Sequence, residues 1–128
     1  IAVSAPNNDG GGTNSGHVRV HKFENGSWVQ MGNDIDGPEA GNIIGWNVEL
    51  SSDGTILGIN SINSSKMLIY KYENGSWVKM GGDINGEPGG KSSYGFSLSS
   101  DGKTVAIGDY LNDDNYPLGH INLLALDK

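Results

Sequence analysis

The chain of 128 residues carries 8 Lys and Arg residues against 15 Asp and Glu residues, for a formal net charge of -7. This acidic balance disfavours nucleic acid or an anionic membrane surface as a partner, because both would be repelled. No apolar run approaches the roughly 18 residues needed to span a bilayer, so we expect no membrane insertion. The lack of cysteine excludes disulfides, thiolate metal sites and a Cys nucleophile.

The first part of the chain predicts three strands. "IAVSAP" at 1–6 and "GHVRVHKF" at 16–23 are rich in branched residues and are separated by a loop of Asn, Asp and Gly. "SWVQM" at 27–31 follows Glu-Asn-Gly, and Asn-Gly is among the strongest short-range signals of a β-hairpin. We therefore expect the second and third strands to form a hairpin.

The same elements return further along the chain, now preceded by an additional strand. Trp28 recurs as Trp77 at a spacing of 49 residues, and Ser-Asp-Gly at 52–54 recurs at 100–102. Each Asp-Gly supplies the backbone conformation of a tight hairpin between two strands. The strands predicted in the second unit are 45–50, 57–62, 65–72 and 76–80, and those in the third unit are 93–98, 105–110 and 119–126.

The repeat also indicates the fold class. No segment carries an apolar stripe of helical period, so we expect little or no helix. In the strand at 65–72, Leu68 and Tyr70 alternate with Met67 and Ile69, which predicts burial on both faces of the sheet. The sequence therefore predicts an all-β fold of β-propeller-type repeats, built from four-stranded antiparallel blades. A β-sandwich or prism is the alternative.

Roughly two and a half such blades are present in a single repeat domain, whereas closed propellers have about four to eight. We expect a partial blade at 1–32, a complete blade at 33–81 and a partial blade at 82–128. The chain is then a fragment of a larger propeller, or a subunit that associates with copies of itself to complete one. Because the last residues lack the Glu-Asn-Gly-Ser-Trp continuation, we expect a chain end there.

The residues at 94–110, "YGFSLSSDGKTVAIGDY", together with "IAVSAPNNDG" and "SGHVRVHKFENGSWVQMG", resemble the FG-GAP or integrin-α-like propeller repeat. The Ser-Ser-Asp-Gly hairpins also resemble those of WD40-like propellers. The integrin-like resemblance implies recognition of proteins or glycans without catalysis, often with calcium in an Asp-rich loop between the first two strands. Here that loop offers one carboxylate per hairpin, Asp53 or Asp101, whereas calcium takes about six to eight oxygen ligands. We expect these hairpins not to hold it.

The loops at 6–16, 62–65 and 110–119 occupy one position of the repeat and differ most among its copies. Variable loops on one edge of a repeat fold are where binding usually resides. Their side-chain oxygens suit calcium, for which Asn7, Asp9 and Asp113 are the candidates, or a sugar; a solvated turn is the alternative. The candidate ligand-binding residues are Asn7, Asn8, Asp9, Asn112, Asp113, Asp114 and Asn115.

Acidic residues recur in the linkers at 33–41 and 82–90, as Asp34, Asp36 and Glu39 and then as Asp83 and Glu87. Paired carboxylates can perform acid–base chemistry when one is buried and its pKa is shifted. Recurrence at the period of the repeat indicates a structural role instead, and the sequence holds no recognisable triad or phosphate loop. We therefore predict no catalytic residues and no enzyme. A propeller hydrolase or lyase that uses Asp34 or Asp36 is the alternative.

The histidines and tryptophans each have two readings. His17 and His21 lie on one face of a strand and His120 matches His17; a surface or inter-blade packing role is favoured, and a transition-metal site is the alternative. Trp28 and Trp77 suit sugar stacking, but their repeated setting favours blade packing, in which each anchors the outer strand against its blade.

Three asparagines satisfy the glycosylation pattern, and two of them also stand at predicted hairpin turns. They are Asn25, Asn63 and Asn74.

Taken together, these features predict a secreted or cell-surface module for binding, adhesion or assembly, of propeller type and without catalysis. Its partner is a protein or glycan, a second copy, or the remainder of a longer chain; a lectin is the alternative. Calcium is the one cofactor that the loops suggest.

Overall fold

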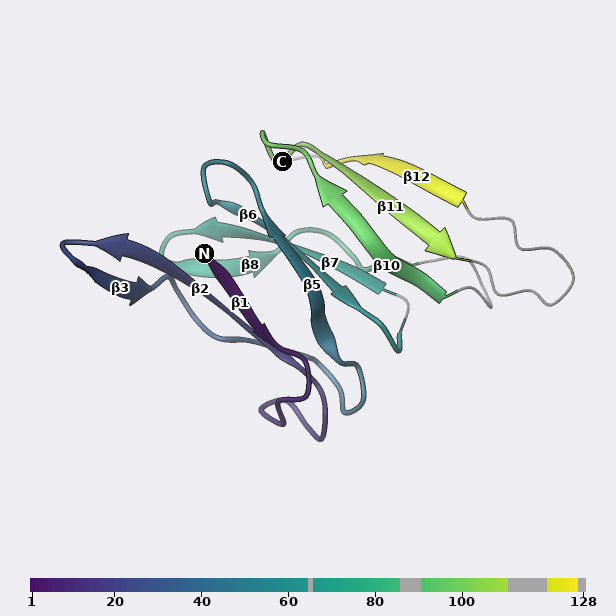
Figure 1. The fold of residues 1–128 in the computed structure, drawn as a ribbon, viewed down its shortest axis with the longest axis horizontal. Coiled ribbons are helices and arrows are strands. Elements are labelled where there is room, and N and C mark those ends of the chain that lie inside the picture. Colours follow the sequence, from purple (N-terminus) through teal and green to yellow (C-terminus); the bar gives the residue numbers. More distant parts are fainter. Residues whose placement is uncertain (65, 86–90, 111–119, 127–128) are drawn as a thin grey trace, which may run out of the picture.

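The computed structural model describes residues 1–64, 66–85, 91–110 and 120–126, with side chains placed except at 91–94, 109–110 and 120–122. The described residues form twelve strands and no helix, arranged in three antiparallel sheets (Figure 1). The prediction of an all-β fold is confirmed. In the part of the chain that is described, no helix has the length and apolar character to cross a membrane.

The first sheet contains β1 (Ala2–Ala5), β2 (His17–Glu24) and β3 (Ser27–Gln30). The Asn25-Gly26 turn between β2 and β3 has positive φ at both residues, 50° and 82°, so the predicted hairpin is confirmed. The chain then returns to β2 with the short strand β4 (Ile35–Asp36). The sequence did not predict β4, because two residues are too few to show a period.

The second sheet repeats this plan with one more strand. It contains β5 (Ile44–Leu50), β6 (Ile56–Ser61), β7 (Lys66–Glu73) and β8 (Ser76–Lys79), and β9 (Ile84–Asn85) pairs with β7 as β4 pairs with β2.

The third sheet contains β10 (Lys91–Leu98), β11 (Thr104–Tyr110) and β12 (His120–Ala125). Among the described residues β12 pairs with β11 alone. The division of the chain at 1–32, 33–81 and 82–128 stays a prediction.

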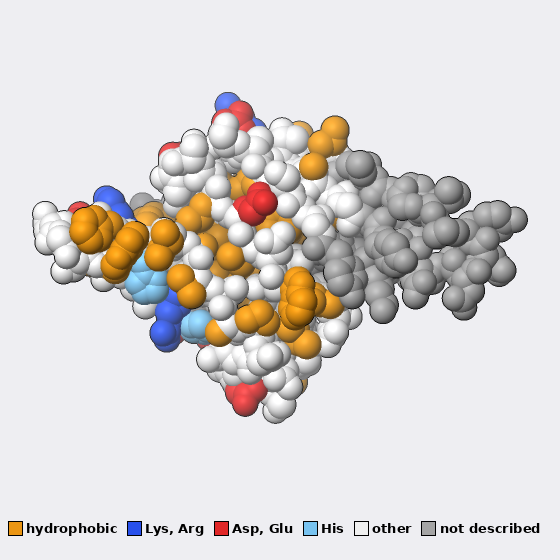
Figure 2. Space-filling model, in the orientation of Figure 1, with side chains coloured by type: hydrophobic (Ala, Val, Ile, Leu, Met, Phe, Trp, Pro, Cys, Tyr) orange, Lys and Arg blue, Asp and Glu red, His pale blue; other side chains and the backbone are white. Residues whose placement is uncertain are grey.

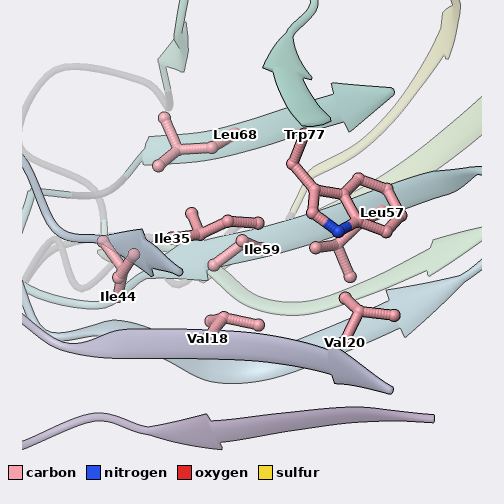
Figure 3. Close-up of a cluster of buried hydrophobic side chains, with 8 residues drawn as sticks. All are labelled: Val18, Val20, Ile35, Ile44, Leu57, Ile59, Leu68 and Trp77. Carbon is pink, nitrogen blue, oxygen red and sulfur yellow. The ribbon is translucent and has the colours of Figure 1, made fainter. Parts of the chain in front are cut away.

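The second sheet lies between the other two and is buried on both faces. β1 and β2 contact β5, while β10 contacts β5, β6 and β7. The first core cluster joins the first and second sheets and is drawn in Figure 3; it contains Val18, Val20, Ile35, Ile44, Leu57, Ile59, Leu68 and Trp77. The second core cluster joins the second and third sheets through Ile56, Met67, Ile69, Phe96, Leu98, Val105 and Ile107. The prediction that β7 is buried on both faces is confirmed, because Leu68 belongs to one cluster and Met67 and Ile69 to the other.

Hydrogen bonds between corresponding parts of the repeat also join the second and third sheets. The backbone N–H and the hydroxyl of Ser52 both donate to the carbonyl of Ser100, each at 2.8 Å. The Leu98 N–H donates to the Glu49 carboxylate at 2.6 Å. These contacts fix the position of each sheet along its neighbour.

Candidate functional site

A polar cluster, which we call the His17 cluster, lies where β2 meets β3 and β4. Because β4 pairs with the beginning of β2 and β3 with its end, side chains from all three strands come together. The register places His17 opposite Asp36. The members of the cluster are His17, Arg19, Gln30, Asp34 and Asp36.

His17 is the buried centre of this cluster, with 8% of the residue exposed. Its Nδ1 lies 2.7 Å from the Asp36 Oδ1, and its Nε2 lies 3.9 Å from the Asp34 Oδ2. A carboxylate only accepts hydrogen bonds, so when the His17 ring is neutral its proton lies on Nδ1, toward Asp36. The other nitrogen, Nε2, then holds a lone pair. Among the described residues, Nε2 of His17 is the buried side-chain nitrogen or oxygen that lacks a hydrogen-bond partner.

Asp34 has a different environment from Asp36. Arg19 donates to it through Nε at 2.9 Å and Nη2 at 3.0 Å, and Gln30 donates through Nε2 at 2.6 Å. These hydrogen bonds, that of Arg19 above all, lower the pKa of Asp34 to about 2. The same hydrogen bond raises the pKa of Arg19. Asp34 therefore remains an anion at neutral pH and is a poor proton acceptor.

The second sheet carries a matching group, the Lys66 cluster, at a spacing of 49 residues. Lys66 replaces His17, and its Nζ lies 3.2 Å from the Asp83 Oδ2; Lys79 also bonds to Asp83. The hydrogen bond from Lys79 first, and then that from Lys66, lowers the pKa of Asp83. The central carboxylate thus recurs with basic partners, but the histidine does not recur.

The other acidic candidates are placed as follows. Glu39 lines a cavity of about 180 Å³ beside the Lys66 cluster, which Ser61 and Ser64 also line. Glu87 lies outside the described residues.

The loop at 6–16 uses its polar side chains for its own turns. The Asn8 Oδ1 accepts from the Gly10 N–H at 2.8 Å, and the Asp9 Oδ1 accepts from the Asn14 N–H at 2.7 Å. Asn7, Asn8 and Asp9 are exposed. Ligand or calcium binding by this loop stays a prediction, and the other candidates, Asn112, Asp113, Asp114 and Asn115, lie outside the described residues.

The Asp-Gly turns form hairpins with positive φ at Gly54 and Gly102, 73° and 68°, as the sequence predicts. The Asp53 Oδ1 accepts from the hydroxyls of Ser51 and Thr55 at 2.7 and 2.8 Å. Asp101 accepts from the Ser99 hydroxyl at 2.7 Å. The chain as far as it is described contains no group of three or more His, Asp or Glu side chains placed to hold a metal ion.

The two tryptophans of the repeat differ in burial. Trp77 is 4% exposed and lies between the first and second sheets. Trp28 stacks at a tilt against Phe23, with ring centroids 5.2 Å apart, but is 55% exposed. Trp28 thus packs within its own hairpin, against a residue of the neighbouring strand. Figure 2 shows apolar side chains gathered at the end of the molecule where β2 and β3 form their hairpin.

The asparagines of the glycosylation pattern have structural roles. Asn25 and Asn74 both have φ of 50° in hairpin turns. Asn63 donates from its side chain to the Gly41 carbonyl at 3.0 Å. Their modification stays a prediction.

Comparisons with solved structures show the fold. The chain is similar to a protein from Lactobacillus plantarum, with a TM-score of 0.51 and 18% identity over 84% of this chain and 34% of that one. It is also similar to a candidate 6-phosphogluconolactonase from Bacteroides fragilis NCTC 9343, with a TM-score of 0.54 and 19% identity over 98% of this chain and 39% of that one. The fold is of β-propeller type. This chain thus spans between a third and two fifths of the length of these two proteins.

No protein-family model and no curated protein matches the sequence.

The comparison corrects two predictions. We expected a binding or assembly module without catalysis and no enzyme, but the Bacteroides fragilis protein that shares this fold is named as an enzyme. The expectation rested on the recurrence of the acidic residues, which holds for Asp34 and Asp83. It does not hold for the pair at the centre of the His17 cluster, because Lys66 and Asn85 stand where the first unit has His17 and Asp36. A fold by itself does not exclude catalysis.

Sequence reasoning missed Arg19 and Gln30 and did not connect His17 with Asp36. A signal was present. Comparison of the two units at a spacing of 49 residues singles out these positions, since Arg19 becomes Leu68 and Gln30 becomes Lys79.

Proposed function

We propose that this chain forms part of a β-propeller hydrolase in which His17 is the general base. The observation that carries the proposal is the buried Nε2 of His17, which has no hydrogen-bond partner while Nδ1 is held by Asp36. An unsatisfied buried polar atom is costly and calls for an explanation, and a catalytic role is one of the few available. The fold shared with a candidate 6-phosphogluconolactonase supports this class of reaction.

The proposed reaction is hydrolysis of a lactone or another ester. Nε2 of His17 takes a proton from a water molecule as the water oxygen bonds to the carbonyl carbon of the substrate. The bond from that carbon to the leaving oxygen then breaks, and the imidazolium returns its proton to the leaving alkoxide. The products are a carboxylic acid and an alcohol, which in a lactone remain in one molecule. Asp36 keeps the imidazole in the required tautomer and stabilises its protonated form.

Arg19 gives this site a preference for anionic substrates. Its guanidinium is half exposed and holds Asp34, which stands 3.9 Å from Nε2. A phosphate or carboxylate of the substrate matches the fork of the guanidinium as Asp34 does. An anionic group that replaces Asp34 on Arg19 also opens the approach to Nε2. The name of the Bacteroides fragilis protein fits this class, a phosphorylated sugar lactone.

The test is turnover of a panel of lactones and esters with and without a phosphate group. Turnover is measured as the opening of the lactone or the release of acid. We expect His17→Gln to lower the rate by about 10²- to 10⁴-fold, as loss of a general base does. Lys66→Gln, at the same place in the second sheet, is the matched control and should leave the rate unchanged.

Two results would overturn the proposal. One is a folded wild-type chain that turns over none of the panel above the uncatalysed rate. The other is a His17→Gln variant that keeps the wild-type rate. Thermal unfolding of each variant separates loss of chemistry from loss of structure.

Several finer predictions from the sequence remain proposals of their own. The FG-GAP or integrin-like kinship, the extracellular location and calcium at Asn7, Asp9 and Asp113 belong here, as do self-association and membership of a longer propeller chain. For calcium, we expect a lower unfolding temperature in chelator than in millimolar calcium. An unchanged temperature would count against the site.

A further inference from the structure

Trp77 occupies a well-defined seat on the first sheet. Its Nε1 donates to the Met31 carbonyl at 2.8 Å, and its backbone N–H donates to the Asn33 Oδ1 at 2.9 Å. Gly32 has φ of 69°, and a Cβ added to it would lie 3.1 Å from Cδ1 of Trp77. A residue with a side chain there would crowd the indole. We call this place the first tryptophan seat, and its residues are Val20, Met31, Gly32 and Ile35.

The second sheet repeats this seat at a spacing of 49 residues, as Ile69, Met80, Gly81 and Ile84. The backbone repeats as well: Met80 donates to the Ile69 carbonyl at 2.8 Å, as Met31 donates to that of Val20 at 2.7 Å. Gly81 has φ of 64°, close to that of Gly32. These four residues line a cavity of about 280 Å³, which we call the second tryptophan seat.

The opposite wall of this cavity is also a repeated feature. Leu124 and Leu126 line it, and in the second sheet their places are held by Tyr70 and Tyr72, which pack against the first core cluster, Tyr72 with its ring centroid 5.2 Å from that of Trp77. The backbone supports this equivalence, because Leu126 donates to the Lys103 carbonyl at 2.7 Å and Tyr72 to that of Thr55 at 2.8 Å.

The two seats differ in the strand beside them: a strand that carries a tryptophan lies next to the first seat and not, among the described residues, next to the second. β7 pairs on one edge with β6 and on the other with β8, which carries Trp77. Among the described residues β12 pairs only with β11. The residues on both sides of the second tryptophan seat are therefore present, and the edge of β12 lies beside them.

We propose that the second tryptophan seat and the edge of β12 bind an extended peptide segment of the pattern Asn-Gly-Ser-Trp-Val. The segment pairs with β12 as β8 pairs with β7, and its indole enters the cavity and donates to the Met80 carbonyl. Strand addition supplies backbone hydrogen bonds, and the cavity supplies specificity for the aromatic side chain. The exposed Trp28 of a second copy is a poorer occupant, because β3 is already paired with β2 in its own hairpin.

The test uses a labelled synthetic peptide with the sequence of residues 73–80, Glu-Asn-Gly-Ser-Trp-Val-Lys-Met, titrated against the whole chain by fluorescence anisotropy. We expect saturable binding of this peptide. The same peptide with Trp77→Ala should bind at least about tenfold more weakly. In the chain, Gly81→Asn keeps a residue that tolerates positive φ but places a side chain at the cavity, so peptide affinity should fall by a similar factor. Gly54→Asn, at a hairpin turn with φ of 73° and nothing nearby, is the matched control and should bind as the wild type does.

Three outcomes would overturn the proposal. They are no binding of the peptide, equal binding of the peptide that lacks tryptophan, and equal binding by a folded Gly81→Asn chain. Sedimentation tests the other occupant: a dimer that Trp28→Ala abolishes, with no peptide binding, assigns the seat to a second copy and contradicts the proposal. Should Gly81→Asn fail to fold, the two peptides alone decide the question.

Discussion

The first and second sheets share one plan but use it differently. In both, a hairpin closed by Asn-Gly leads to a short strand that returns to the same partner, and a carboxylate, Asp34 or Asp83, is held by basic side chains. Around this common frame the first sheet has His17 and Asp36, whereas the second has Lys66 and Asn85. The recurring residues are those that the fold needs, and the residues that change are those from which a site can be built.

The two tryptophans show the same contrast in packing. The side chain of Trp77 is enclosed because another sheet lies against it, while Trp28 has the same local sequence, stacks on Phe23 and remains 55% exposed. Burial therefore depends on the neighbouring sheet and not on the motif that carries the residue.

The largest expected effect tests this contrast directly. Trp77→Ala should lower the free energy of unfolding by about 3–5 kcal/mol, because it leaves a cavity in the first core cluster. Trp28→Ala should cost less than about 1 kcal/mol, since most of that side chain is already in water. Urea unfolding of both variants measures the difference. Equal losses would mean that Trp28 is covered in solution.

The next effect concerns the pair His17 and Asp36. Asp36→Asn keeps the shape of the side chain but no longer favours the tautomer with a lone pair on Nε2, so the proposed hydrolysis should slow by about 10²-fold or more. The substrate KM should change little, because Asp36 is not proposed to touch the substrate. Asn85→Asp is the control in the second sheet and should leave turnover unchanged. Wild-type turnover in Asp36→Asn would remove Asp36 from the mechanism.

The smallest effect is on stability in acid. The pKa of Asp34 is about 2 in the folded chain against an ordinary value of 3.8, and that of Asp83 is also lowered. A carboxyl group with a lowered folded pKa stabilises the fold above its unfolded pKa and loses that contribution as the pH falls toward the folded value. The free energy of unfolding should therefore decline between pH 4 and pH 2.

Asp34→Asn and Asp83→Asn should each make that decline shallower, as measured by urea unfolding across the pH range. Because both ion pairs are largely solvated, the change should be modest and should shrink at high salt. If neither variant alters the decline, the loss of stability in acid arises from other carboxylates.

Much of the fold could be predicted from the sequence, for reasons visible in single elements. Asn25-Gly26 and Asp53-Gly54 impose backbone conformations that few other residues adopt, so their hairpins follow from local chemistry. Met67 and Leu68 lie on opposite faces of the second sheet, because successive side chains of a strand alternate between the two faces. The strand β4 could not be predicted, because its position depends on the positive φ of Gly32 and on pairing with residues of β2 that lie 17 and 19 positions earlier, Val18 with Ile35 and His17 with Asp36.

The candidate site was predictable only in part. Sequence reasoning found Asp34, Asp36 and His17 as separate features, but their meeting depends on the register that sets His17 opposite Asp36. It also treated repetition as a sign of structure for all acidic residues alike. The lowered pKa of Asp34 arises from Arg19, a residue on another strand that no local pattern connects with it.

The bonds from Ser52 to Ser100 and from Glu49 to Leu98 have a mechanical consequence. They connect equivalent turns and strands of the second and third sheets. When the two ends of the chain are pulled apart, sliding of the second sheet past the third requires these hydrogen bonds to break. These contacts therefore add to the resistance of the two sheets to shear along the direction of their strands.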